Sequence, residues 1–197
     1  MFNSEKRPKT KRGEATRKKI LEAAEKEIGS KGFSEASISS ITTAAGVGQG
    51  TFYIYFDSKE EILRALVVDY SQSIRHMLTE ASASGTTRLE KERLGLKAFI
   101  DYVRSHRHFY LIIHEAMFID PEIYQQYYLQ FSKAYIRRLD EACEAGEIKN
   151  VDTEVCSWAL MGMGEFIGYR FGILDKETPS DKVVDAVYSM IEKGLQT

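Results

Sequence analysis

The chain has 197 residues, a formal net charge of −2 and 43% hydrophobic residues, enough for one sizeable core or for a small domain joined to a larger one. No apolar signal-peptide segment opens the sequence, and Glu165 and Arg170 interrupt its longest apolar stretch, residues 155–174, which argues against a membrane span. Cys143 and Cys156 lack metal-binding or disulfide-framework spacing, so we expect a cytoplasmic protein whose two thiols are either buried and unreactive or a redox pair.

Positive charge is concentrated at the start of the chain. Residues 1–19 hold eight Lys or Arg against Glu5 and Glu14, which leaves +6 there and −8 over the remainder. A basic arm of this kind can contact DNA phosphates, and it can equally be a solvated tail. The sequence leaves both interpretations open.

The first expected elements are two helices. One runs from Thr10 or Gly13 to Lys31 with an apolar stripe at every fourth position, and Gly32 is expected to end it. Ser37 is a candidate N-cap for a second, short helix. The apolar face of that helix is formed by Ile38, Ile41 and Ala45.

A glycine-rich break and an aromatic helix follow. Gly46 and Gly48 permit a sharp reversal of the chain. In the next helix Phe52 and Phe56 lie four residues apart and point towards a core, while polar groups gather at its N-terminus. This arrangement predicts a helix-turn-helix whose second helix enters a major groove.

The motif Gly46-Val47-x-x-Gly50-Thr51-Phe52-Tyr53-x-Tyr55-Phe56-x-x-Lys59-Glu60 resembles the signature of the TetR family of bacterial transcriptional regulators. With the preceding helix, the resemblance covers roughly the first third of the chain. Two positions depart from the family pattern. Gly48 stands where a hydroxyl residue is usual, and Thr42 replaces a small alanine.

The resemblance implies a set of DNA-binding residues. Gln49, Gly50, Thr51 and Tyr53 would approach base edges, while Tyr55 and Lys59 would bind phosphate. The side-chain chemistry agrees, because glutamine can pair with adenine, the threonine methyl can meet a thymine methyl, and glycine allows close backbone approach. Packing in the core is the alternative for the two tyrosines. Helix capping is the alternative to phosphate contact for Ser37, Ser39 and Ser40.

Five further helices are expected beyond a long fourth one. Ser58 and Glu61 form a capping box that opens the fourth helix, and Asp120-Pro121 and Thr178-Pro179 are typical helix starts. The expected ranges are 58–81, 88–105, a helix ending near 119, 121–146, 152–174 and a last helix after 179. The sequence therefore predicts an all-α fold of about nine helices, with a helix-turn-helix domain over residues 1–57 and a regulatory domain over residues 58–197.

The regulatory domain is rich in aromatic residues and methionine. Most such residues pack in a core, but hydrogen-bonding groups at helical spacing among them favour an apolar pocket with a few polar anchors for a small lipophilic ligand. The candidate lining is Tyr102, His106, His114, Met117, Tyr127, Phe131, Trp158, Met161 and Glu165.

Three glycines spaced four residues apart suggest a dimer interface. Gly164, Gly168 and Gly172 would let another helix approach closely, and the last helix adds Val184, Val187 and Ile191. The resemblance likewise implies dimerisation through the last two helices. The alternative is that this glycine stripe packs inside one chain.

The function that we infer is a homodimeric repressor that a ligand releases from its DNA operator, although activation is also open. The alternative is an all-α small-molecule-binding protein or an enzyme without DNA function. No nucleophile–base pair, phosphate-binding loop or cofactor motif is present. His106, His108 and His114 lack a carboxylate or cysteine partner at helical spacing, so neither a metal nor a cofactor is expected.

Overall fold

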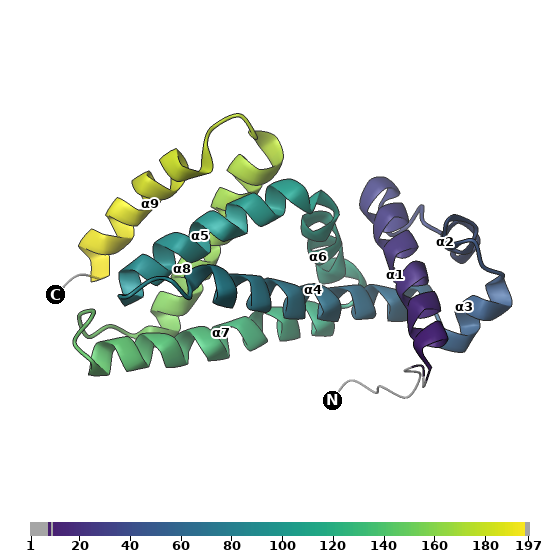
Figure 1. Ribbon diagram of the computed structural model, residues 1–197, viewed down its shortest axis with the longest axis horizontal. Helices are drawn as coiled ribbons and strands as arrows, with labels where there is room; N and C mark the ends of the chain where they lie inside the picture. Colours follow the sequence, from purple (N-terminus) through teal and green to yellow (C-terminus); the bar gives the residue numbers. More distant parts are fainter. Residues whose placement is uncertain (1–7, 9, 196–197) are drawn as a thin grey trace. The chain divides into compact units, whose positions relative to one another are not determined.

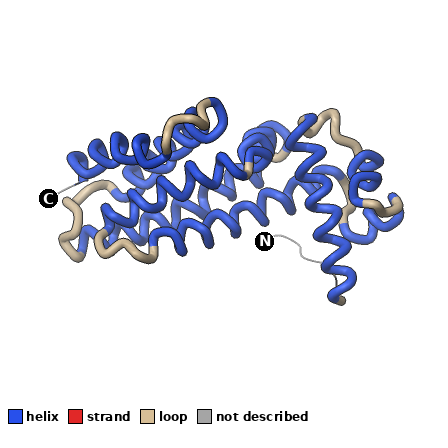
Figure 2. Tube along the Cα trace, turned by 45° about the horizontal axis from the view of Figure 1, so that its top comes forward, coloured by secondary structure: helices blue, strands red, loops and turns tan. Residues whose placement is uncertain are grey.

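The computed structural model describes residue 8 and residues 10–195, and all regular elements among them are helical (Figures 1 and 2). The predicted all-α fold of about nine helices is confirmed. The part of the basic arm that includes Lys6, Arg7 and Lys9 lies outside the described residues. In chain order the elements are α1 Lys11–Lys31, α2 Ile38–Ala45, α3 Gln49–Tyr55, α4 Lys59–Ser82, α5 Arg88–Ser105, α6 Arg107–Ile119, α7 Pro121–Glu144, α8 Thr153–Gly168, the π-helix η1 Tyr169–Leu174 and α9 Ser180–Leu195.

Side-chain caps fix where several helices begin. The Thr10 hydroxyl accepts from the Gly13 amide at 3.1 Å, and the Ser58 hydroxyl accepts from the Glu61 amide at 3.2 Å. At the start of α5, Thr87 and Glu90 cap each other reciprocally. Each cap satisfies an amide that the first helical turn leaves without an intrahelical partner. These local signals are the reason that the predicted helix starts agree with the structure.

The end of α8 differs from the sequence prediction of one helix to residue 174. The α-helix ends at Gly168, and six residues of π-helix follow. The Arg104 side chain of α5 donates from Nε to the Phe171 carbonyl at 2.9 Å, and the Asp175 amide closes a wide turn on the Arg170 carbonyl at 2.9 Å. Tertiary contacts with α5, which no local sequence signal reveals, stabilise this rare winding.

The chain forms two compact units. Unit 1 contains the described residues up to Tyr70 together with residues 108–125, and unit 2 contains residues 71–107 and the described residues from 126 onwards. Helices α4 and α7 therefore contribute to both units. The compact units do not divide between residues 57 and 58, and the assignment of residues 1–57 to DNA binding and of residues 58–197 to regulation stays a prediction.

In unit 1, α6 is bonded to the end of α1. The Glu115 carboxylate of α6 accepts from the Phe33 amide at 2.7 Å, just after Gly32 has ended α1 with a φ of 86°. A Cβ on Gly29 would lie 2.4 Å from the Cβ of His108, so the helices touch where glycine leaves room. Unit 1 is thus more than a three-helix head, because α6 packs directly on it.

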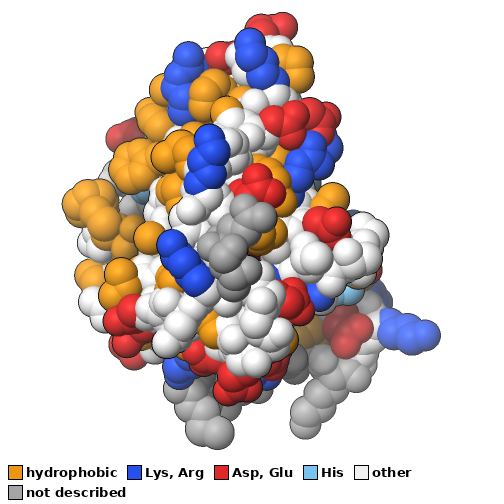
Figure 3. All heavy atoms as spheres, turned by 90° about the vertical axis from the view of Figure 1, so that its left-hand side faces the viewer, with side chains coloured by type: hydrophobic (Ala, Val, Ile, Leu, Met, Phe, Trp, Pro, Cys, Tyr) orange, Lys and Arg blue, Asp and Glu red, His pale blue; other side chains and the backbone are white. Residues whose placement is uncertain are grey.

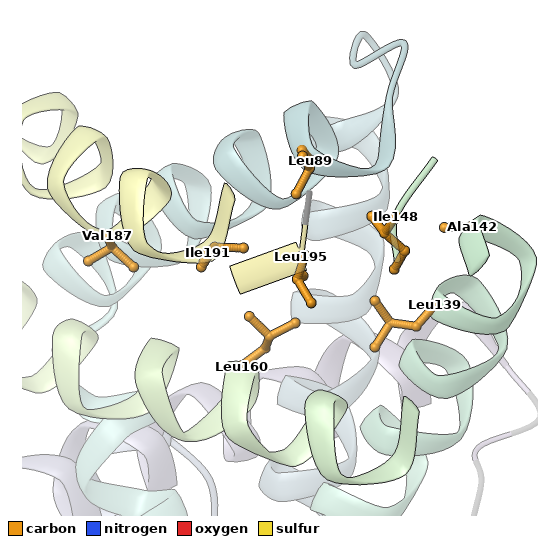
Figure 4. Close-up of a cluster of buried hydrophobic side chains, with 8 residues drawn as sticks. All are labelled: Leu89, Leu139, Ala142, Ile148, Leu160, Val187, Ile191 and Leu195. Carbon is orange, nitrogen blue, oxygen red and sulfur yellow. The ribbon is translucent and has the colours of Figure 1, made fainter. Parts of the chain in front are cut away.

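In unit 2, α5, α7, α8 and α9 contribute to a cluster of buried apolar side chains (Figure 4). Val187 and Ile191 belong to this cluster, and Val184 is fully buried in a second one beside Ile100 and Val183. Three residues expected at a dimer interface therefore lie in the core of their own chain. The cluster shown in Figure 4 is Leu89, Leu139, Ala142, Ile148, Leu160, Val187, Ile191 and Leu195.

No helix within residues 10–195 combines the length and the apolar character that crossing a membrane requires.

Candidate DNA interface and ligand cavity

The helix-turn-helix of unit 1 is built around two glycines and two buried rings. Gly46 ends α2 in the left-handed conformation with a φ of 66°. Phe52 and Phe56 are buried with ring centroids 5.7 Å apart, and they anchor α3. Gly48 occupies the N-cap of α3 without any side-chain hydrogen bond, which is the consequence expected from the missing hydroxyl residue.

The side of α3 away from these rings is open to solvent. Gln49 and Gly50 are exposed, Thr51 is half-buried, and 49% of Tyr53 is accessible. A Cβ on Gly50 would meet nothing within 4 Å, so another molecule's backbone can come close there. The four residues expected to reach base edges thus share the exposed part of a short, well-anchored helix.

The serines at the start of α2 play different roles. The Ser37 hydroxyl accepts from the Ser40 amide at 3.0 Å, and the Ser40 hydroxyl accepts from the Ser37 amide at 3.1 Å. Ser37 and Ser40 therefore form a reciprocal cap, whereas Ser39 exposes its side chain. Tyr55 is half-buried, and its hydroxyl lies near Gly13 at the start of α1.

Lys59 lies at the start of α4 and holds the turn between α1 and α2. Its Nζ donates to the carbonyls of Phe33 at 2.5 Å and Ala36 at 2.7 Å, and it lies 4.3 Å from the centroid of the Phe33 ring. An ammonium has three N–H donors, and the Lys59 Nζ also lies 3.5 Å from the Ser34 carbonyl oxygen as a third, longer hydrogen bond. Lys59 therefore has a structural role in unit 1, and its contact with a DNA phosphate stays a prediction.

Unit 2 contains a cavity of about 210 Å³, bounded by α4, α5, α7, α8 and α9. Four of the expected ligand-binding residues line it: Tyr127, Phe131, Met161 and Glu165. Gly164, expected at the dimer interface, also lines this cavity. The spacing of aromatic residues on α7 was thus a useful signal for the cavity wall.

Five expected ligand-binding residues do not line this cavity. Tyr102 and His106 stack on each other at the end of α5, with ring centroids 4.0 Å apart and His106 exposed. His114 and Met117 belong to unit 1, on α6. Trp158 lies on the outer side of α8 and is 42% exposed. Chemical type alone could not decide which face of each helix these side chains occupy.

Four cations among the cavity-lining residues were missed by the sequence reasoning. Arg75, Arg88, Lys91 and Arg138 accompany the carboxylates Glu92 and Glu165 along a mainly apolar wall. Cationic side chains beside an apolar cavity suit a ligand that has a hydrocarbon part and an anionic part. The only sequence signal for this part of the lining is the spacing of Arg88 and Glu92, which are four residues apart. Oppositely charged residues at this spacing are also common on solvated helices, so the spacing does not indicate a cavity.

Arg88, Glu92 and Tyr135 form a buried polar group on this wall. The Arg88 Nη2 lies 2.7 Å from the Glu92 Oε1, and the side chains are 10% and 8% exposed. The Tyr135 hydroxyl donates to the other Glu92 oxygen. Burial raises the pKa of Glu92, although the Arg88 charge and these hydrogen bonds oppose the rise. Burial, together with the neighbouring Glu92 charge, also raises the pKa of Tyr135.

The glycines of α8 and η1 pack mostly inside the chain. A Cβ on Gly168 would lie 2.7 Å from the Phe99 ring, and one on Gly172 would lie 2.5 Å from the Val103 Cγ1. A Cβ on Gly164 would meet nothing within 4 Å. The alternative that the stripe packs within one chain therefore holds for Gly168 and Gly172.

A different face of α8 carries exposed apolar side chains. Val155, Trp158 and Phe166 are 64%, 42% and 75% exposed, and exposed Gly162 lies between them on the same helical face. Met190 of α9 is 68% exposed. Exposed hydrophobic side chains are unevenly distributed, and Figure 3 shows them gathered along one side of the face in view. Such a row is typical of a protein–protein interface.

Comparisons with known proteins agree with this architecture. Residues 20–66, which contain α2 and α3, match the family described as bacterial regulatory proteins, tetR family. An uncharacterized HTH-type transcriptional regulator of Bacillus subtilis, YdgC, is 28% identical over 196 residues, covering 93% of this chain and 96% of the relative. The fatty acid metabolism regulator protein of the same organism is 26% identical over 148 residues, covering 73% of this chain and 76% of that protein.

Among solved structures, the transcriptional regulator FadR of Bacillus subtilis in complex with stearoyl-CoA has a TM-score of 0.78. The match covers 88% of this chain and 96% of FadR at 20% sequence identity. The fatty acid degradation regulator FadR of Bacillus halodurans has a TM-score of 0.79, again at 20% identity, with 93% of this chain and 96% of the other covered. At this identity the likeness shows the fold alone.

Proposed function

We propose that this chain is a DNA-binding transcriptional regulator of the TetR family and not an enzyme, and that it is a homodimeric repressor that an acyl ligand releases from its operator. The observation that carries the proposal is the exposed polar edge of α3, formed by Gln49, Thr51 and Tyr53 above the buried rings of Phe52 and Phe56. A helix presented in this way can enter a major groove without rearrangement of its core.

Substitutions on α3 test the DNA-reading role. Gln49→Ala or Tyr53→Ala should weaken operator binding about 5- to 100-fold, as expected for the loss of one base or backbone contact. The operator can be selected from random duplexes with the protein itself, and affinities can be measured by fluorescence anisotropy. Gln125→Ala, an exposed glutamine on α7, is the matched control. Unchanged affinity in both α3 variants, with melting temperatures preserved, would refute this role.

The cavity supports a ligand with a slender apolar chain and an anionic head. Its volume is about 210 Å³ and its wall is mainly apolar, which suits the hydrocarbon chain of a ligand whose polar part lies nearer to solvent. Partly buried Arg75, Lys91 and Arg138 can pair with phosphate groups. Since the similar FadR structure is a complex with stearoyl-CoA, we propose a long-chain acyl-CoA thioester as the ligand class.

Ligand release can be measured on the same operator duplex. An acyl-CoA should lower operator affinity, while CoA without a chain should have little effect because it cannot fill the apolar cavity. The ligand acts by binding the low-affinity conformation more tightly than the DNA-bound one, so release depends on that difference alone. Operator affinity that no acyl-CoA of any chain length alters would exclude this ligand class.

One recognition helix reads too few base pairs for useful specificity, so DNA recognition calls for a dimer. The exposed apolar row on α8 can supply the interface between the two chains. We place the interface on Val155, Trp158, Gly162 and Phe166, with Met190 of α9. Phe166→Asp should convert the dimer to a monomer in sedimentation equilibrium. Phe118→Asp changes a phenylalanine that is 78% exposed on α6 and should leave the dimer intact. The opposite pattern would place the interface elsewhere.

A further inference from the structure

The buried group of Arg88, Glu92 and Tyr135 is not fully hydrogen-bonded. The Glu92 Oε1 lies 2.7 Å from the Arg88 Nη2 as an ion pair but accepts no hydrogen bond from the described residues, and the other Glu92 oxygen accepts from the Tyr135 hydroxyl. The Arg88 Nε is buried and has no hydrogen-bond acceptor among the described residues. A buried N–H without an acceptor is unfavourable, and all three side chains line the cavity. An acceptor brought by a ligand would remove that cost.

The charge of Glu92 restricts which acceptor is suitable. The carboxylate already balances the guanidinium, so a second carboxylate placed against Arg88 would stand beside Glu92 in a region of low dielectric constant. An uncharged carbonyl oxygen meets no such repulsion. Other cavity-lining cations, Arg75, Lys91 and Arg138, are only partly buried and remain available to anionic groups nearer to solvent.

We propose that Arg88 is a specificity-determining residue whose Nε–H donates to the carbonyl oxygen of a bound acyl thioester, and that Glu92 makes this position accept an uncharged carbonyl in preference to a carboxylate. This inference rests on the proposed function, since it takes the cavity as the ligand site. It adds that the protein distinguishes an activated acyl group from the free acid. The discrimination comes from the buried ion pair and not from chain length.

The first arm of the test compares dodecanoyl-CoA with S-dodecyl-CoA, in which a methylene replaces the carbonyl. Isothermal titration calorimetry should show the wild-type protein binding the thioester about tenfold or more tightly than the thioether, as expected for one hydrogen bond from a charged donor. Arg88→Met should bring this ratio close to one. Equal affinities in the wild-type protein would overturn the inference, and this comparison requires no variant.

The second arm compares dodecanamide with dodecanoate. The wild-type protein should prefer the amide by about tenfold, and Glu92→Gln should abolish or reverse this preference because the guanidinium then lacks its counterion. Glu141→Gln removes one negative charge from the exposed side of α7 and should leave the ratio unchanged. A preference for the amide that survives Glu92→Gln would overturn the role of Glu92.

The two arms separate this inference from the proposed ligand class. If neither CoA compound binds the wild-type protein, the acyl-CoA proposal fails, and the inference fails with it. If both bind equally and both lower operator affinity, the proposed function stands and the carbonyl contact is refuted. Measured melting temperatures decide whether a loss of binding in Arg88→Met or Glu92→Gln reflects unfolding.

Discussion

The substitution Gly172→Ala provides a sharp test of how α5 packs against η1. An added Cβ would lie 2.5 Å from the Cγ1 and 2.9 Å from the Cβ of Val103, which is fully buried. A β-branched side chain with one preferred rotamer cannot move aside easily. The two helical segments must therefore separate by several tenths of an ångström or more.

Two opposing effects set the expected magnitude. Replacing glycine by alanine in a helix favours folding by about 1 kcal/mol, while overpacking a core costs about 1–3 kcal/mol. Gly164→Ala brings only the favourable effect, because its Cβ meets nothing within 4 Å. Gly168→Ala should fall between the two, since it meets the far edge of the Phe99 ring at 2.7 Å. The free energies of unfolding of Gly164→Ala and Gly172→Ala should thus differ by about 1–3 kcal/mol.

Urea unfolding followed by circular dichroism measures this difference, and thermal melting should show it as about 3–10 °C. The sign matters more than the size. If Gly172→Ala stabilised the protein as much as Gly164→Ala, the close approach of η1 to Val103 would be wrong. If Gly172→Ala instead left stability unchanged and dissociated the dimer, the glycine stripe would lie between chains and not within one.

Two further predictions concern unit 1. Lys59→Met should lower the free energy of unfolding by about 1–3 kcal/mol, because it removes a charged donor from two buried carbonyls, whereas Lys19→Met on the exposed face of α1 should not. The slope of log operator affinity against log salt should stay unchanged in Lys59→Met, while a lost phosphate contact would reduce it by about one. Burial opposes ionisation of Asp120, but hydrogen bonds from Arg64 and from backbone amides prevail and lower its pKa. The stabilisation is therefore present above the unfolded pKa of about 4 and is lost as the pH falls through the folded value, so Asp120→Asn should flatten the acid limb of a stability–pH profile.

The helix-turn-helix could be predicted from the sequence because its determinants are local. Gly46 allows the left-handed backbone that ends α2, Phe52 and Phe56 are one helical turn apart, and Ser37 caps the helix that follows it. Each of these choices is made within four residues along the chain. The same reasoning placed the start of α7 correctly, where Asp120 supplies the cap, and the structure adds Thr87 as the cap of α5.

The faces of α8 could not be predicted from the sequence. Apolar residues occur on every side of this helix, so periodicity does not distinguish the core at Leu160, the cavity at Met161 and the solvent at Phe166. The glycine spacing was equally compatible with contact inside one chain and between two. The structure decides for Gly168 and Gly172 because Phe99 and Val103 of α5 occupy the space beside them.

The sequence reasoning placed Glu165 in the cavity lining but missed its cations and Glu92. In a sequence, Arg88 and Glu92 resemble a solvated pair on the surface of a helix, and only the placement of Tyr135 on α7 shows that they are buried. Buried charge of this kind contributes little net stability, since desolvation offsets most of the Coulomb attraction. Its presence on a cavity wall agrees with the role in ligand recognition that we propose for this pair.

Helix α8 connects the two proposed sites of unit 2. Met161 and Glu165 line the cavity, while Trp158 and Phe166 belong to the exposed row one face away on the same rigid helix. A ligand that moves the cavity wall must also move that row, because a packed α-helix rotates or shifts as one body. Ligand binding at the cavity and the geometry of the proposed dimer interface are then thermodynamically linked. If operator DNA favours one dimer geometry, it must lower the affinity for the ligand by the same factor by which the ligand lowers the affinity for DNA.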